Sequence, residues 1–434
     1  MFKITSLLLL LGVLGEFYGA DAAKVVCYWN GKSFWREGVA KVTAEDLKPG
    51  LSYCTHLYYG FAGIDDDDYH VEPLDKKLDL DKGKAQYRAV VGLKRSQPGL
   101  QVYLSVGGLE DTDDPEKYFE VLEKPERRTI FVNSMVALLK EFQFDGVDLA
   151  WQFPQKNEKY ESYTFASIWH KFKKTLGFGV DSKATEHRDQ FTALLREMKA
   201  ALRAHGYSLS IGVLPHVNAS VYYDIRTLMP FVDMVTLFTS DLRTPERSPK
   251  LADYSAPLYF QYGRLEHQNV DYLVKYWLEH GADPAKLIVG IPTYGRSWKT
   301  TTDSSISGVP PLVADGPGNK GPHTKTEGLL AYYETCTRLV SPTNPKAPAS
   351  MLRRITDPSH RLGTYAYRLP DKTKGEKEGM WVSFEEPETA ADKANFVKAK
   401  GLGGAALLDI ALDDPKGMCD GTKFPILRAV KLNL

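Results

Sequence analysis

Short apolar runs alternate with longer amphipathic segments along most of the chain. The runs are rich in Val, Ile, Leu and Tyr and end in Gly, Pro or Asp, as buried parallel strands do. Eight of them occur, at residues 24–28, 56–61, 101–106, 146–151, 208–214, 232–238, 286–291 and 404–409. Helical periodicity lies between them, for example at residues 186–205 and 388–400. The pattern predicts a (β/α)8 barrel, although periodicity alone also permits an open doubly wound sheet.

Two stretches interrupt this alternation. Residues 155–185 follow the fourth predicted strand and are rich in lysine with interleaved aromatic residues. We expect them to form a surface element over the barrel mouth. Residues 299–379 lie between the seventh and eighth predicted strands, are rich in Gly and Pro at their start and then contain apolar runs. We expect a small α+β insertion there, so the barrel itself would comprise residues 23–298 and 380–434.

The first 22 residues have the pattern of a secretory signal. Lys3 supplies the positive charge, residues 4–14 are apolar, and Ala20 and Ala22 form a small-x-small cleavage site. The run is too short to span a bilayer, so a buried first helix is the alternative. No later apolar run is long enough to cross a membrane, and we expect a secreted, extracellular protein. Because 55 basic residues balance 55 acidic ones, the overall charge gives no reason to expect nucleic acid as a partner.

Four cysteines, an even number, indicate two disulfides in a secreted chain, with three possible connectivities. Cys27 and Cys54 each accompany a predicted strand, and neighbouring parallel strands could bring them together. That pairing would leave Cys336 with Cys419. A zinc site is the alternative, but the spacing lacks a Cys-x-x-Cys pair. Asn218 begins an Asn-Ala-Ser sequon and is a predicted N-glycosylation site.

The fourth predicted strand carries the most informative motif. Residues 144–154 read Phe-Asp-Gly-Val-Asp-Leu-Ala-Trp-Gln-Phe-Pro. This stretch resembles the signature of family 18 glycoside hydrolases, the chitinases, in which Asp-x-x-Asp-x-Asp-x-Glu occupies the fourth barrel strand. Asp145 and Asp148 match the signature, whereas Ala150 and Gln152 replace its third Asp and its Glu. Strand alternation places residues 148, 150 and 152 on one face, directed into the barrel mouth.

Three further segments match the same family in the expected order. Residues 104–108 (Leu-Ser-Val-Gly-Gly) resemble its third-strand motif, residues 290–296 its seventh-strand motif, and residues 403–405 the start of its eighth. The resemblance implies substrate-assisted hydrolysis, in which the Glu protonates the leaving sugar and the neighbouring Asp orients the substrate acetamido group. A positioned acid contributes about 10²–10⁴-fold to the rate, and the amide of Gln152 has no proton of suitable acidity.

Other departures lie at the remaining positions of the family's site. Residues 238–241 read Phe-Thr-Ser-Asp where the family has Met-x-Tyr-Asp. Ser240 therefore replaces the tyrosine that holds the acetamido group, and Asp241 is expected to serve a structural hydrogen bond. Leu408 replaces a tryptophan that forms the floor under the sugar, and Ala411 replaces a further Asp. Loss of a stacking aromatic could remove about 1 kcal/mol from sugar binding.

Sugar binding without hydrolysis is still conceivable, and the residues that we expect to take part are Tyr28, Gln152 and Asp241. We expect no catalytic residue, no cofactor and no metal. The alternatives are a chitin- or glycan-binding lectin that uses the degenerate cleft, and a residual glycosidase. Ala150, Gln152 and Ser240 together argue against the glycosidase.

One branch of the family resembles this chain in particular, the insect imaginal disc growth factors, which are secreted chitinase-like proteins. The further matches are residues 34–38, 151–154, 214–218, 244–247 and 423–428. The resemblance implies a haemolymph or matrix protein that promotes cell proliferation, motility or cuticle organisation without hydrolysis. Its partner would be a cell-surface receptor or a matrix component, and a chito-oligosaccharide is a further possible ligand.

Overall fold

The computed structural model describes residues 23–108, 110–111, 114, 116–153, 181–340, 351–370 and 379–434. The predicted signal at residues 1–22 lies outside the described residues. So does most of the basic stretch at residues 155–185. Among the helices that the structure describes, none combines the length and apolar character needed to cross a membrane.

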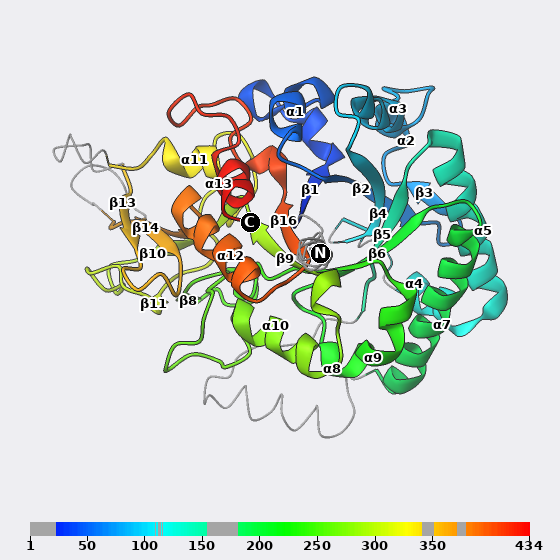
Figure 1. The fold of residues 1–434 in the computed structure, drawn as a ribbon. Coiled ribbons are helices and arrows are strands. Elements are labelled where there is room, and N and C mark those ends of the chain that lie inside the picture. The colour runs from blue at the N-terminus through cyan, green and yellow to red at the C-terminus, as the bar shows by residue number, and fades with distance from the viewer. Residues whose placement is uncertain are drawn as a thin grey trace, which may run out of the picture.

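Eight parallel strands close into a barrel, which confirms the predicted fold class (Figure 1). In chain order they are β1 (Lys24–Asn30), β2 (His56–Ile64), β4 (Gln101–Gly107), β5 (Gly146–Ala150), β6 (Ser208–Val213), β7 (Met234–Leu237), β9 (Leu287–Pro292) and β16 (Gly404–Leu408). Closure comes from β1, which pairs with β16 on one side and β2 on the other. The short β3 (Val71–Pro73) adds to β2 in antiparallel fashion. An open doubly wound sheet is thereby excluded.

Helices surround the barrel, as Figure 1 shows. The longer ones are α1 (Ala44–Leu51), α3 (Gln86–Gly92), α4 (Glu116–Glu123), α5 (Pro125–Phe142), α7 (Ala184–Arg203), α10 (Val270–Glu279), α12 (Pro387–Ala399) and α13 (Pro425–Asn433). The four-residue helices are α2 (Lys76–Asp79), α8 (Ala219–Tyr222) and α9 (Ile225–Leu228). Helix α7 shows why they form: Phe191, Leu194, Leu195, Met198 and Leu202 recur every three or four residues and are all buried. This apolar stripe packs on the barrel.

The barrel interior is filled by side chains that alternate with the outward-facing ones along each strand. Aromatic rings dominate it, since Tyr58 stacks on Tyr103 with ring centroids 4.9 Å apart, and Tyr28 meets Tyr58 edge-on at 5.0 Å. Val26, Met234, Ile288, Ala406 and Leu408 belong to the same buried cluster.

The predicted insertion between the seventh and eighth barrel strands is present. Its antiparallel sheet has the order β12-β10-β15-β14-β13. The strands are β10 (Tyr294–Thr300), β12 (Leu329–Ala331), β13 (Arg353–Thr356), β14 (Thr364–Arg368) and β15 (Gly379–Phe384), with helix α11 (Tyr332–Cys336) after β12. Its first strand begins before residue 299, because a single residue separates β9 from β10. Its last strand, β15, extends beyond residue 379. A two-stranded ladder of β8 (Leu251–Ala252) and β11 (Leu312–Val313) lies nearby in Figure 1.

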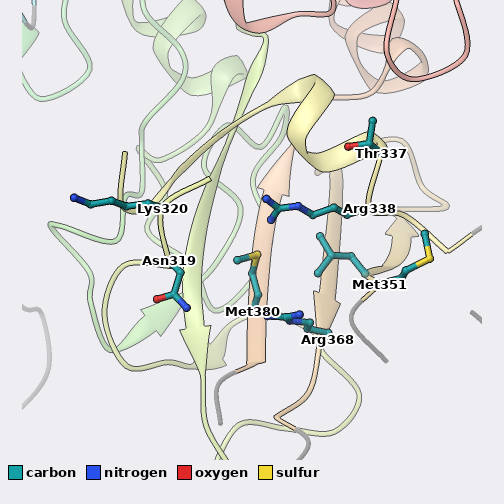
Figure 2. Close-up of a pocket in the computed structure, with 8 residues that line it drawn as sticks. Asn319, Lys320, Thr337, Arg338, Met351, Arg368 and Met380 are labelled. Atoms are coloured by element: carbon teal, nitrogen blue, oxygen red, sulfur yellow. The ribbon is translucent and has the colours of Figure 1, made fainter. Parts of the chain in front are cut away.

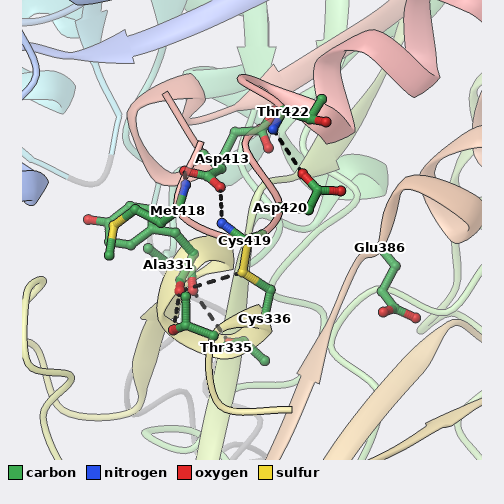
Figure 3. Close-up of a disulfide and its surroundings, with 12 residues drawn as sticks. Ala331, Thr335, Cys336, Glu386, Asp413, Met418, Cys419, Asp420 and Thr422 are labelled. Carbon is green, nitrogen blue, oxygen red and sulfur yellow. Dashed lines mark hydrogen bonds between the residues drawn. A yellow bond between two sulfur atoms is a disulfide. The ribbon is translucent and has the colours of Figure 1, made fainter. Parts of the chain in front are cut away.

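Both expected disulfides form. Cys27 in β1 joins Cys54 just before β2, with 6.0 Å between the Cα atoms. Cys336 at the end of α11 joins Cys419 in the segment after β16, at 5.8 Å (Figure 3). The Asp414 carboxylate accepts hydrogen bonds from the backbone N–H groups of Met418 and Cys419, both at 2.8 Å. The second disulfide therefore ties the inserted subdomain to the C-terminal part of the barrel.

Candidate functional site

Asp148 lies inside the barrel, surrounded by hydroxyl groups from three other strands. Its carboxylate accepts hydrogen bonds from Tyr28 of β1 at 2.9 Å, Ser105 of β4 at 2.8 Å and Ser210 of β6 at 2.8 Å. The side chain is fully buried, and this burial raises the pKa of Asp148 although the three hydroxyl groups act in the opposite direction. The predicted inward direction of this side chain is therefore what the structure shows.

Gln152 follows β5 and is nearly buried at 8% exposure. Its Nε2 donates hydrogen bonds to the backbone carbonyl oxygens of Gly108 and of Asp111, the second at 3.3 Å. Ala150, the completely buried last residue of β5, precedes it by two positions, and its side chain offers no polar atom. The amide N–H groups are thus bonded to the loop after β4. A carboxylate at this position has no donor and would be repelled by the same carbonyl oxygens.

The loop that receives this amide is itself fixed by a buried carboxylate. Asp111 accepts a hydrogen bond from Tyr118 at 2.6 Å and one from the backbone N–H of Ile64 at 3.1 Å, and it forms an ion pair with Lys117 at 2.7 Å. Gly108 has a φ of +66°, and a Cβ there would lie 2.6 Å from the ring of Phe61. The glycine in the third-strand motif is therefore required by the close approach of this ring.

Asp145 lies at the other end of β5 and does not approach the barrel mouth. Its carboxylate pairs with Lys94 at 2.9 Å and accepts the backbone N–H of Val102 at 2.8 Å. The five residues of β5 follow it, a rise of roughly 17 Å at about 3.3 Å per residue, so Asp145 lies far from the carboxyl end of the strand. The first Asp of the signature therefore has a structural role here, joining β5 to β4.

Asp241 is held by charge rather than by a lone hydrogen bond. Arg296 donates to its two carboxylate oxygens at 2.7 and 2.6 Å, and the Tyr294 hydroxyl donates at 2.8 Å. Burial would raise the pKa of Asp241, but the Arg296 charge and these hydrogen bonds hold it below its usual value. Ser240 lies 3.2 Å from the same Tyr294 hydroxyl. Arg247 donates to the Asp241 backbone carbonyl, so two arginines hold this residue, one at its side chain and one at its backbone.

At the end of β16, Leu408 is buried in the barrel interior, and a Cβ at Gly290 would lie 2.8 Å from it. Burial raises the pKa of the adjacent Asp409 to about 6, against the opposing charge of Arg36. Its carboxylate accepts the backbone N–H of Ala411 at 3.0 Å. Strand β16 therefore ends in a buried apolar side chain and is followed by a turn that the Asp409 carboxylate caps.

Sequence reasoning missed Trp35. It ends the 3₁₀ helix η1 (Gly31–Trp35), which follows the carboxyl end of β1, and 49% of the residue is exposed. Its ring is oriented by a 2.7 Å hydrogen bond from Nε1 to Asp75 and by edge-on contact with Phe34. Loops at this end of the strands form the active sites of (β/α)8 enzymes. The aromatic pair Phe34 and Trp35, shortly after the first predicted strand, is the feature of the sequence that could have indicated this residue.

Asn218 caps helix α8, and its Oδ1 accepts the backbone N–H of Ser220 at 3.1 Å and the Ser220 hydroxyl at 2.8 Å. Glycosylation of its amide stays a prediction.

Comparison with known proteins defines the class. The model of glycosyl hydrolases family 18 matches residues 24–413, so the chain belongs to that family. The chain is 46% identical over 440 residues to Bacteria-responsive protein 1 of Aedes aegypti, covering 100% of this chain and 99% of that protein. It is 46% identical over 442 residues to Chitinase-like protein Idgf4 of Drosophila melanogaster, covering all of both. These full-length similarities confirm the resemblance to the chitinase-like, imaginal disc growth factor branch.

A solved structure shares the fold. Human YKL-39, described as a pseudo-chitinase with retained chitooligosaccharide binding properties, superposes with a TM-score of 0.75 at 26% identity. The match covers 95% of this chain and 99% of that one.

Proposed function

We propose that this protein is a secreted chitinase-like growth factor that does not hydrolyse chitin. The observation that carries the proposal is the side chain of Gln152, which stands where the family has its acid and donates its amide to two backbone carbonyls. Ala150 supplies no carboxylate beside it. The barrel therefore retains the family's fold and the buried Asp148 of its signature, while the side chain of Gln152 holds the loop after β4.

Relatives support the growth-promoting part of the proposal. The similarity to Idgf4 extends over the full length of both chains, so the aligned region includes the sequence of every barrel strand and of the insertion. The signal pattern at residues 1–22 supports secretion, and two disulfides suit an oxidising compartment. A receptor or a matrix component is the partner that such a role requires.

The direct test is a proliferation assay on cultured insect cells. The purified secreted protein should raise cell number in a dose-dependent way, and the same protein unfolded by reduction of both disulfides should not. A fluorogenic chitobioside supplied to the same preparation should stay intact. No response of the cells to folded protein would contradict the growth-factor role.

Glycan binding is a second candidate function, favoured by the exposed ring of Trp35 at the strand ends and by the pseudo-chitinase neighbour that is described as binding chitooligosaccharides. Sugars stack on exposed aromatic rings, and such a contact contributes about 1 kcal/mol. We expect Trp35→Ala to weaken the binding of tetra-N-acetylchitotetraose about fivefold in calorimetry. Tyr262→Ala, which removes another exposed aromatic ring, is the matched control. Equal affinity of the native protein and both variants would remove Trp35 from the binding surface.

A further inference from the structure

The inserted subdomain contains a pocket of about 570 Å³ (Figure 2). None of the described residues that line it belongs to the family signature at residues 144–154. Two buried apolar side chains, Leu352 and Met380, line it, and the half-buried Met351 lies beside them. The charged residues of its lining are all cationic, namely the exposed Lys320 and the half-buried Arg338 and Arg368. Among the described residues that line it, none is acidic.

The subdomain sheet fixes these side chains relative to one another. Met380 of β15 pairs with Arg368 of β14 and with Lys299 of β10. Residues directly opposite in an antiparallel sheet share a face, so this row places a methionine between two cations. The segment after α11 is joined to the residue just before β13, since the Leu352 N–H donates to the Arg338 carbonyl at 2.8 Å. Strand pairing therefore fixes Met380 and Arg368, and this hydrogen bond positions Arg338 and Leu352.

Placing Arg338 and Arg368 at one pocket has an electrostatic cost. Burial lowers the pKa of Arg338, and the charge of Arg368 lowers it further, against the opposite effect of Glu334. Glu334 is already committed, because its carboxylate accepts the backbone N–H groups of His323, Thr324 and Ala331 at 2.7, 2.9 and 2.9 Å. An anion in the pocket would offset the repulsion between the two guanidinium groups.

We propose that this pocket binds a small organic anion, with its acidic head group at Arg338 and Arg368 and its apolar body on Met380 and Leu352. Guanidinium groups suit carboxylate and phosphate because their N–H donors form paired hydrogen bonds with both. The volume lies within the range of about 300–1,000 Å³ that is typical of small-molecule sites. This proposal is independent of the barrel and holds whether or not the protein binds sugar or stimulates cells.

Methionine-methyl NMR and calorimetry on the full-length protein test the proposal with hexyl phosphate, hexanoate, inorganic phosphate and 1-hexanol as probes. Hexyl phosphate or hexanoate should shift the methyl signals of Met351 and Met380 and leave those of the buried core residues Met135 and Met198 unchanged. The tighter of the two identifies the preferred head group. Inorganic phosphate should bind at least tenfold more weakly, and 1-hexanol should give no shift.

Charge removal gives the second arm. Arg338→Gln and Arg368→Gln should each weaken the binding of the anionic probes at least tenfold, whereas Arg353→Gln, an exposed position on β13, should leave it unchanged. The proposal is overturned if neither anionic probe moves the two methyl signals, or if 1-hexanol or inorganic phosphate binds as tightly as hexyl phosphate. Full affinity in both arginine variants overturns it as well. Should these variants fail to fold, the methyl shifts of the native protein decide alone.

Discussion

Replacing Gln152 by glutamate converts an amide donor into a carboxylate at a site where the neighbouring polar groups are backbone carbonyl oxygens. The native Nε2 donates to the carbonyls of Gly108 and Asp111, and the side chain is 8% exposed. An ionised carboxylate has no donor to offer, so it would face two acceptors with little access to water. We therefore expect Gln152→Glu to destabilise the fold instead of simply restoring the family's acid.

The magnitude follows from the contacts that are lost. Two hydrogen bonds of about 1 kcal/mol each disappear, and an unpaired buried group adds about 1–3 kcal/mol. We expect a total of about 3–5 kcal/mol at pH 8. At about 2.1 cal/mol/K per residue, a chain of 434 residues unfolds with an entropy of about 0.9 kcal/mol/K, so the Tm should fall by about 3–6 °C.

The cost should depend on pH in a definite direction. Burial and the two carbonyls should raise the pKa of the introduced carboxyl above the value of about 4.3 for an exposed glutamate. Below that value the folded and unfolded chains are both protonated, and the destabilisation is smallest. It should grow as the pH rises toward the folded-state pKa and level off above it.

Scanning calorimetry of the native and variant proteins at pH 4 and pH 8 measures this difference. Gln101→Glu, the same change at an exposed position at the start of β4, is the matched control and should shift the Tm by less than 1 °C, since it costs at most about 0.5 kcal/mol. An equal Tm shift for Gln152→Glu at both pH values, or one no larger than that of the control, would refute the role assigned to the amide.

The same variant should remain inactive toward a fluorogenic chitobioside. The family resemblance implies that the groups at positions 150 and 240 orient and hold the acetamido group. Ala150 and Ser240 lack those groups, so we expect that the acid alone would have no activated substrate. Recovery of ordinary chitinase rates by Gln152→Glu would show that these two losses matter less than the family resemblance implies.

Two further predictions concern buried charges. Lys393→Met should cost about 3–5 kcal/mol in urea unfolding because it leaves Glu385 buried without its partner, and adding Glu385→Leu should recover most of the loss; an unrecovered double variant would contradict this. Arg296→Gln should cost about 3–5 kcal/mol of unfolding free energy at pH 7, because it leaves the Asp241 carboxylate buried without its charged partner. The cost should be smaller near pH 3, where the carboxyl can be protonated, and a cost independent of pH would contradict this prediction.

Much of the fold could be predicted from the chain because buried parallel strands leave continuous apolar runs. All eight predicted runs overlap the observed barrel strands. The bounds of the insertion could not be read in the same way. Thr293 alone separates β9 from β10, so a barrel strand leads almost directly into a subdomain strand. The residues on both sides of this link belong to one family motif, which hides the change of sheet.

The direction of the site side chains could be predicted from the sequence, but their hydrogen-bond partners could not. Alternation along β5 placed Asp148 and Gln152 toward the barrel mouth. The partners of Asp148, such as Tyr28, lie as many as 120 residues away, and the closed register that joins them is a property of the barrel. The carbonyl partners of Gln152 come from a loop whose path no periodicity describes. Arg296 was assigned to a strand motif, and its pairing with Asp241 follows from the position of β10.

Incubation with tetra-N-acetylchitotetraose, followed by mass spectrometry of the products, tests the central claim most directly. The family resemblance implies that Gln152 stands at the position of the proton donor, with Ala150 replacing the neighbouring Asp. The account predicts that the tetrasaccharide stays intact, as in buffer alone, under conditions in which an active family 18 chitinase cleaves it. Release of shorter sugars above the buffer control by the native protein would contradict the claim that this barrel has lost its hydrolytic chemistry.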